Sequence, residues 1–563
     1  MHAIDWLLVI VLNGAVIAYA LWPQRGVRAG AHSSREWFLA GRSLPWWVVG
    51  LSLFATAIDS SDIVADSGGA YVFGASTFVF NWVGTAGGWV LMAHAIALPM
   101  YRAGMYTNAE YLEARFGPLA RILSVVVQVQ YRTLVLGIIS RTLFLTLSIA
   151  CGLGDGAAWT AVVVISAIAI AYTVVGGLRS VAITDALQSV VMLAASLVVF
   201  VVVWQHVGGW SGVEDGLTRE DPEIAARLLH AGMDRVEPDG AGGVRTSPAW
   251  LVALTFVIGG LAYAVVNHTQ SMRLLGARSE RDLKLAVVLG ALALIVVTFL
   301  NLSMGIFGRV LHPELGAAGE ADHVYPTLVA EFCGVGLRGL VVAGVLAAAF
   351  STYDSIGSTL AALVVRDVYA RVFVKDRDDA HYVRAGRWVV PLVIFGSFAY
   401  LPILGEAGMF ATYLELVGAF VVPLLAVYLM GVFTPVHRRA GAVGLIVGVA
   451  YGALALAAPG VASEHGIALL PEALRDSFAT APMSLIVTAS AMIAVSLACG
   501  WSRGGHALHE EQSGWLRASR AELRAADSAR VPTTNDGRGD WLALALGLAV
   551  AALGAWLAFV VFW

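Results

Sequence analysis

Apolar stretches of about 20 residues, long enough for a helix to cross a bilayer, recur along the whole chain, with polar residues between them. The pattern predicts an all-α integral membrane protein of about fourteen transmembrane helices. The expected spans are 4–22, 46–73, 75–100, 118–150, 157–176, 181–205, 249–270, 282–311, 337–365, 386–404, 408–433, 440–460, 481–500 and 541–562. The first stretch lacks a preceding Lys or Arg and a small-residue cleavage pattern, so we expect a permanent helix rather than a signal peptide.

Two of these spans carry polar interruptions. In the second span Asp59, Asp62 and Asp66 would share one face of a continuous helix. Carboxylates inside a span are costly unless they face a wet cavity or a partner. The seventh span, five spans later, carries two glycines at 259–260 and four polar residues at 267–270. This separation is typical of an inverted repeat in which spans 2–6 and 7–11 are the two halves, with ligands bound where helices are broken.

The ninth span places hydroxyl groups and a carboxylate within two turns of an apolar helix, at Ser351, Thr352, Asp354 and Ser355. Oxygen ligands of this kind suit hard cations. The alternative interpretation is that these side chains bond to the preceding turn or to a neighbouring helix, as Ser and Thr commonly do in membranes.

Composition supports a lipid environment. Hydrophobic residues make up 58% of the 563 residues and charged residues only 13%, whereas soluble domains carry about 25% charged residues. The net charge of −4 is small and no basic cluster suggests nucleic acid. The three cysteines lack metal-type spacing. Without a phosphate-binding loop or a nucleophile–base constellation, we expect neither an ATP-driven pump nor an enzyme.

Loop charges predict the orientation. Arg and Lys gather in the segments 23–45, 271–284 and 366–387, whereas the loop 206–247 holds eight acidic and four basic residues. Because inside loops are enriched in Lys and Arg, both termini are expected outside. The use of Arg in place of Lys suggests a GC-rich bacterial source, and therefore the cell inner membrane as the location.

Four ordered stretches resemble the sodium/solute symporter family, which includes sodium/glucose, sodium/proline and sodium/sialic acid transporters. They are residues 36–47 (EWFLAGRSLPWW), 106–117, 176–188 (GGLRSVAITDALQ) and 349–369. The resemblance runs from about residue 33 to 440. It implies a LeuT-like 5+5 inverted-repeat core at 46–433. This core would lie between a first helix with its loop at 1–45 and three further helices with a cytoplasmic loop at 434–563.

The resemblance also implies where sodium binds. The main site would lie between the broken second span and the ninth span. Its ligands would be the backbone carbonyls of Ala55, Ile58 and Ala348 and the hydroxyls of Ser351 and Thr352. A second, family-variable sodium site would use Asp185 with Ser351 and Ser355; alternatively, Asp185 serves the exit route of the ion.

The solute positions depart from those of the sugar transporters. Asn81 stands where they have a sugar-binding Glu, Asp62 where they have a Gln, and the region of Ala293 where they have a Lys. Only Asn267 has the amide side chain that the sugar transporters carry at the corresponding position. A hexose is therefore a poor fit to this chain.

Arg132, in the fourth span, lies in a region similar to that of an Arg that holds the substrate carboxylate in the sialic acid transporters. A guanidinium pairs with a carboxylate through two hydrogen bonds. The alternative is an ion pair between Arg132 and Asp59, Asp62 or Asp66. If both an Arg and an Asp reach the cavity, a zwitterion such as an amino acid fits; Glu415 is a further candidate contact.

The sequence thus predicts a sodium-coupled secondary active symporter that imports a small, carboxylate-bearing organic solute by alternating access. The expected solute contacts are Asp62, Asn81, Arg132 and Asn267, and the coupling ion is sodium. A proton-coupled or uncoupled carrier is the nearest alternative. A membrane sensor on the same fold is more distant, because no kinase segment follows the last predicted helix.

Overall fold

The computed structural model describes residues 1–21, 34–238, 244–317, 320–404, 408–465, 469–471, 474, 476–501, 514–528 and 537–563. Among these residues, twelve helices are long and apolar enough to cross a membrane, and a bent pair of helices forms one more span. A shorter apolar helix, α1 (Ala3–Leu21), lies at the N-terminus. The fold class predicted from the hydrophobic pattern, an all-helical membrane protein of about fourteen spans, is confirmed.

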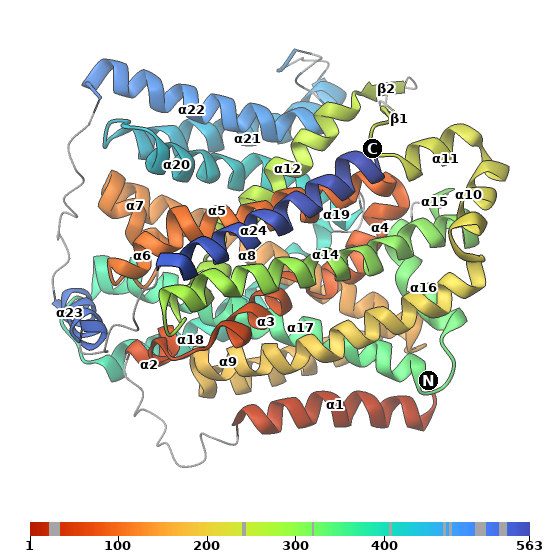
Figure 1. The fold of residues 1–563 in the computed structure, drawn as a ribbon, viewed down its shortest axis with the longest axis horizontal. Coiled ribbons are helices and arrows are strands. Elements are labelled where there is room, and N and C mark those ends of the chain that lie inside the picture. The colour runs from red at the N-terminus through yellow and green to blue at the C-terminus, as the bar shows by residue number, and fades with distance from the viewer. Residues whose placement is uncertain are drawn as a thin grey trace.

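The long helices run side by side in one bundle (Figure 1). The first spans are α3 (Trp46–Ala57) with α4 (Ser60–Phe73), then η4 (Phe80–Thr85) to α6 (Leu98–Arg102) through α5 (Ala86–Leu91), and α8 (Pro118–Leu145). The helix α9 (Asp155–Val207) holds two spans, Asp155–Val175 and Gly177–Val207, which meet at a kink at Gly177. The remaining spans are α12 (Ala249–Val266), α14 (Glu280–Leu311), α17 (Leu337–Ala362) continued by η8 (Leu363–Phe373), α18 (Asp379–Gly396), α19 (Met409–Leu416) with α20 (Val422–Phe433), α21 (Ala440–His465), α22 (Thr480–Cys499) and α24 (Gly537–Trp556).

Shorter elements gather at the two ends of the bundle. One end, called here the α7 end, carries α2 (Ser34–Leu39), α7 (Asn108–Phe116), α13 (His268–Leu275) and α23 (Gly514–Ser528). The other, the α11 end, carries α10 (Gly209–Glu220), α11 (Pro222–Leu229), the antiparallel pair β1 (Arg235–Pro238) and β2 (Val244–Ser247), η7 (Ala321–His323) and α16 (Val324–Phe332). Both termini lie toward the α11 end (Figure 1).

The predicted interruptions of the second and seventh spans are present. Ile58 has extended backbone between α3 and α4, which meet at 50°. Asp59 then caps α4 by accepting the Ser61 N–H at 2.7 Å, which explains why an acidic residue stands at the break. In the seventh span Asn267 has φ −65° and ψ 106°, and its side chain accepts the Thr269 N–H to start α13.

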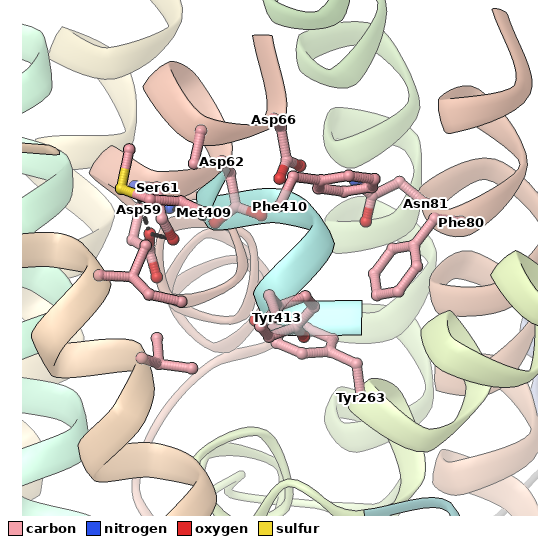
Figure 2. A pocket seen from close by; sticks show the side chains of 13 residues that line it. Asp59, Ser61, Asp62, Asp66, Phe80, Asn81, Tyr263, Met409, Phe410 and Tyr413 are labelled. Carbon is pink, nitrogen blue, oxygen red and sulfur yellow. Dashed lines mark hydrogen bonds between the residues drawn. The ribbon is translucent and has the colours of Figure 1, made fainter. Parts of the chain in front are cut away.

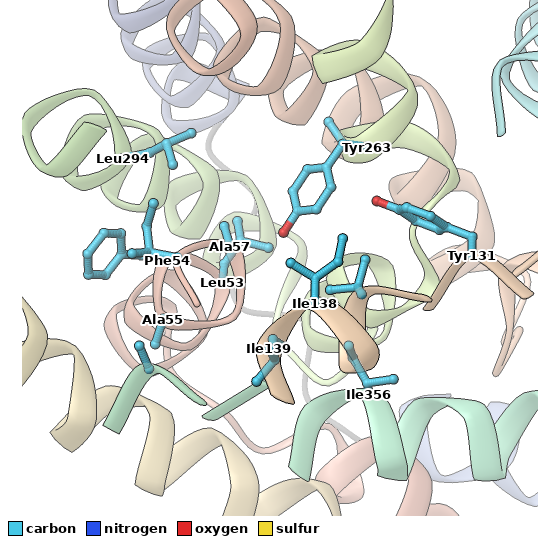
Figure 3. Close-up of a cluster of buried hydrophobic side chains, with 14 of the residues drawn as sticks. Leu53, Phe54, Ala55, Ala57, Tyr131, Ile138, Ile139, Tyr263, Leu294 and Ile356 are labelled. Carbon is cyan, nitrogen blue, oxygen red and sulfur yellow. The ribbon is translucent and has the colours of Figure 1, made fainter. Parts of the chain in front are cut away.

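Small and apolar residues surround these breaks. Figure 3 shows Leu53, Phe54 and Ala57 of α3 packed in one buried cluster with Ile138 of α8 and Tyr263 of α12. Elsewhere α12 crosses η4 so closely that a Cβ on Gly260 would lie 2.1 Å from the Phe80 carbonyl oxygen. Close backbone approach at small residues is the usual way in which membrane helices pack.

The assignment of basic residues to polar loops needs a correction. Arg273 and Lys284, counted as charges of an inside loop, are buried in α13 and α14, and Arg273 is fully inaccessible to solvent. The polar segments 206–247 and 501–540, which the hydrophobic pattern did not resolve into elements, contain α10, α11, β1 and β2 in the first and α23 in the second. These elements are too short and too polar to stand out in a hydrophobic pattern.

Candidate functional site

The break in the second span exposes backbone oxygens toward α17. In a continuous helix the Asp59 N–H would bond to the Ala55 carbonyl, but it donates to Asp62 Oδ2 at 2.8 Å instead. The freed Ala55 carbonyl accepts from Ser351 Oγ at 2.8 Å, and the Ala348 carbonyl lies 2.9 Å from the same hydroxyl. Three of the oxygens expected to bind sodium thus meet between α3 and α17: the carbonyls of Ala55 and Ala348 and the Ser351 hydroxyl. Thr352 follows Ser351 in the sequence of α17.

Thr352 strengthens this assignment. The residue is fully buried, yet its Oγ1 has no hydrogen-bond partner in the described part of the chain. A buried hydroxyl is almost always hydrogen-bonded, because an unpaired one costs about 1–3 kcal/mol. Carbonyl and hydroxyl oxygens are the donors that fit a hard monovalent cation, and an unpaired hydroxyl one residue from Ser351 is available for such an ion.

Asp185, on α9, lies in a second buried cluster. Its Oδ2 accepts from Ser52 Oγ at 2.6 Å and from Arg273 Nη2 at 3.0 Å. Arg273 also donates to Ser355 Oγ. The structure therefore brings Asp185 and Ser355 together, but through a guanidinium that the sequence analysis had placed in a loop. Asp185 Oδ1 remains without a partner among the described residues.

A cavity lies between the broken second span and the helices around it (Figure 2). It measures about 480 Å³, including the part open to solvent. Its polar lining comes from α4 and from the span that begins with η4, and its aromatic lining from α12 and α19. The lining residues are Asp59, Ser61, Asp62, Ala65, Asp66, Phe80, Asn81, Val135, Ile138, Tyr263, Met409, Phe410 and Tyr413.

The four predicted solute contacts have different positions relative to this cavity. Asp62 and Asn81 line it. Asn267 lies outside its lining and caps α13. Arg132 lies just behind the lining: its guanidinium carbon is 5.4 Å from the centre of the Tyr131 ring, and Tyr131 bonds to the lining residue Tyr413 at 3.1 Å.

The guanidinium of Arg132 is fully buried, and none of its three nitrogens has a hydrogen-bond partner within the described ranges. It makes no direct ion pair with a second-span carboxylate there, although Asp59 is close enough to interact electrostatically. The alternative of a structural ion pair is therefore not what the structure shows. Arg132 keeps its full hydrogen-bonding capacity next to the cavity.

The sequence analysis missed the aromatic residues of the site. The Tyr263 hydroxyl lies 3.4 Å from the Thr56 carbonyl oxygen in the broken second span, and Gln270 donates to the same hydroxyl at 3.1 Å. Tyr263 thus connects the cavity to the oxygens near Ala55. The only sequence signal was an aromatic residue between the glycines and the polar run of the seventh span, which is too weak to assign a role.

Aromatic rings close the cavity toward the α11 end. Phe410 lines both this cavity and a larger one of about 840 Å³, whose walls include Asp322 and Phe478. The Phe410 ring lies 5.9 Å from that of Phe73 and 6.0 Å from that of Phe256. Glu415, a candidate contact from the sequence, lines the larger cavity and not the smaller one.

A buried ionic network closes the α7 end. Arg121, at the start of α8, pairs with Glu113 and Asp367 and lies 3.8 Å from Glu110. Arg366 contacts Glu110 at 3.2 Å. All of these side chains except Glu113 are completely inaccessible to solvent.

Helix α23 docks on this network. Arg520 reaches Glu110 at 2.7 Å, and the Trp515 ring stacks on Tyr382 with 4.0 Å between ring centres. Burial alone would raise the pKa of Glu110, but the guanidinium groups of Arg520, Arg366 and Arg121 hold that pKa at about 2. Glu110 is therefore a permanent anion at neutral pH, shared between the bundle and α23.

A family model described as "Sodium:solute symporter family" matches residues 37–448. Similar proteins include sodium/glucose cotransporter 1 of Ovis aries, 27% identical over 80% of this chain and 71% of its own length. Another is the sodium/glucose cotransporter of Vibrio parahaemolyticus, 26% identical over 79% of this chain and 83% of its own.

Solved structures are similar in fold. A Na+-coupled sialic acid symporter in a substrate-bound outward-open state superposes with a TM-score of 0.72, at 17% identity, over 90% of this chain and 99% of the other. Mhp1, a nucleobase-cation-symport-1 family transporter, gives 0.52 at 15% identity, over 87% and 98%. The architecture is therefore the LeuT-like fold with two inverted five-helix repeats.

Proposed function

The chain belongs to the sodium:solute symporter family, and from this premise we propose that it imports a small organic solute together with sodium by alternating access. The transport core is residues 46–433, with 1–45 and 434–563 as additions on either side. Each sodium ion that enters with the membrane potential contributes about 2.3 kcal/mol per 100 mV, besides its concentration gradient.

One observation carries the coupling to sodium. The Ser351 hydroxyl contacts the freed Ala55 carbonyl and the Ala348 carbonyl, between the two helices that must move against each other, and the next residue, Thr352, has a buried hydroxyl without a partner among the described residues. A cation bound there joins α3 to α17. Because Tyr263 reaches the same break from the solute cavity, an ion at the break favours the geometry in which the cavity is complete.

The orientation follows from the loop charges. The α7 end faces the cytoplasm and the α11 end faces the outside, in the inner membrane of a bacterial cell. In this state the cytoplasmic side is closed by the ionic network around Arg121, whereas the outer side is closed by the ring of Phe410 and its neighbours.

For the solute we propose a carboxylate-bearing molecule. The argument is the Arg132 guanidinium, which is buried, adjacent to the cavity and free of hydrogen bonds within the described residues. A carboxylate can accept two of its N–H groups at once. Rotation of Tyr131 or Tyr413 would bring the cavity and the guanidinium into contact, since these two rings separate them.

A thermal-shift screen of the purified protein tests this proposal. Amino acids, monocarboxylates, sialic acids and sugars are each added in sodium and in potassium. Stabilisation that requires sodium, and that is lost when Ser351→Ala is combined with Thr352→Val, supports the symporter. If a solute raises the melting temperature equally in potassium, the protein is a proton-coupled or uncoupled carrier and not a sodium symporter. If a carboxylate still raises the melting temperature of Arg132→Ala, Arg132 does not bind the solute.

A further inference from the structure

The carboxylates of the cavity are not equivalent. Asp59 accepts the backbone N–H of Ser61 and also its hydroxyl, so it is used in capping α4. Asp62 gives one oxygen to the Asp59 N–H at 2.8 Å. Asp66 has neither a hydrogen bond nor an ion pair in the part of the chain that the structure describes, and it is only partly buried because it faces the cavity. In the view of Figure 2, Asp66 lies next to Phe410, and Asn81 lies beyond the Phe410 ring.

The charge of this cavity is uncompensated. Its lining holds three carboxylates and no Lys, Arg or His. The nearby Arg132 interacts electrostatically with Asp59. Among the three carboxylates, Asp59 and Asp66 lie at opposite ends, with Asp62 between them (Figure 2). Asp62 and Asp66 are one helical turn apart on the same face, where like charges repel. At membrane depth such a pair is costly unless one carboxylate binds a proton or a cation enters from outside the protein chain.

Aromatic rings form the apolar part of the cavity wall around Asp66. Phe80, Tyr263, Phe410 and Tyr413 line the same cavity, and the Phe80 and Tyr413 rings lie 6.1 Å apart edge to face. The faces of aromatic rings attract organic cations, with about 2 kcal/mol or more when the contact is desolvated. A metal ion would gain little from these rings, whereas an ammonium group with carbon substituents gains from both the rings and the carboxylates.

We propose that Asp66, assisted by Asp62, binds an ammonium group of the transported solute, which is therefore a zwitterion of the amino-acid or betaine class. The inference rests on the proposed function of this cavity as the solute site. The carboxylate of the solute points toward Arg132, and its ammonium group lies between Asp66 and the rings of Phe80 and Phe410. One positive charge on the solute is enough to balance Asp66, the carboxylate without a partner among the described residues.

The test uses the full-length protein and a matched set of probes. Thermal shifts in sodium are measured with the twenty common amino acids and glycine betaine. They are compared with lactate and propionate, which lack the ammonium group, and with glucose, which lacks both charges. The variants are Asp66→Asn, Asp66→Glu and, as a matched loss of one negative charge, Asp215→Asn on the exposed surface of α10.

We expect a sodium-dependent shift from at least one zwitterion and none from lactate, propionate or glucose. Asp66→Asn should weaken its apparent affinity about tenfold or more, the usual scale for a hydrogen-bonded charge pair. Asp66→Glu should retain part of the affinity and Asp215→Asn all of it. The unliganded melting temperature of each variant shows whether it is folded.

Three results would overturn the inference while leaving the symporter in place: a sodium-dependent shift from glucose or lactate alone, an unchanged zwitterion affinity in Asp66→Asn, or no shift from any zwitterion. If Asp66→Asn instead keeps solute affinity but removes the pH dependence of sodium-driven uptake, Asp66 carries a proton and not the solute. Failure of the proposed function is distinct, because then no probe gives a shift that depends on sodium.

Discussion

Thr352→Val should separate the two roles that a buried hydroxyl can have. Valine has nearly the shape of threonine, so the substitution removes the oxygen and leaves the packing of α17 in place. If the hydroxyl were structural, its loss would destabilise the protein. Because Thr352 Oγ1 has no hydrogen-bond partner in the described residues, we expect the sodium-free protein to keep its stability or to gain up to about 1 kcal/mol.

The response to sodium should change in the opposite direction. Loss of one of five oxygen ligands, taken as about 1.4 kcal/mol, weakens sodium binding about tenfold. At a sodium concentration 100 times the dissociation constant, binding stabilises the folded protein by about 2.7 kcal/mol, and a tenfold loss reduces this to about 1.4 kcal/mol. Sodium should therefore protect the variant about half as well as the original chain.

Thermal unfolding followed by tryptophan fluorescence measures both quantities, since the chain has 17 tryptophans. Titrations with sodium and potassium are run on the original chain, Thr352→Val and Ser351→Ala. Ser351 bonds to the carbonyls of Ala55 and Ala348, so its replacement should lower stability even without sodium. A Thr352→Val protein that is less stable in potassium but keeps its full response to sodium would refute the assignment of this oxygen to the ion.

Other predictions concern the aromatic rings around Phe410 and the ionic network that joins Glu110 to α23. Gly69→Ala places a Cβ 2.6 Å from the Phe410 ring and should destabilise the protein by about 1–3 kcal/mol in thermal unfolding, whereas Gly87→Ala, with open space around it, should be neutral or slightly stabilising. Glu110 has a depressed pKa, so it stabilises the folded state above the ordinary carboxyl pKa, and this contribution is lost as the pH falls from about 4.5 to 2. Glu110→Gln should be less stable at neutral pH and should show a smaller loss over that acid range. Trp515→Ala should speed amide hydrogen exchange across α23, and the exposed Arg517→Ala should not.

Features with a local cause could be predicted from the sequence. The breaks at Ile58 and Asn267 follow from acidic, amide and hydroxyl side chains in otherwise apolar spans, and those side chains cap the helices that start there. The length of the spans follows from hydrophobicity alone. Asp62 and Asn81, two of the predicted solute contacts, line the cavity, and their role as contacts stays a prediction.

Features that depend on distant partners could not be predicted. Arg273 was assigned to a loop because a basic residue at the end of a span normally marks a membrane surface, and its buried partner Asp185 is 88 residues away. The role of Phe410 depends on rings from two other segments, Phe73 on α4 and Phe256 on α12. Helix α23 was missed because its few apolar positions acquire meaning only against Tyr382 and Glu110.

The position of α23 in the chain has a consequence for how strongly it must hold the ionic network. The helix is covalently joined to α22 on one side and α24 on the other, so its docking is an intramolecular event. Short connections of this kind give effective concentrations in the millimolar range. Contacts too weak to hold a separate peptide can then keep α23 bound most of the time.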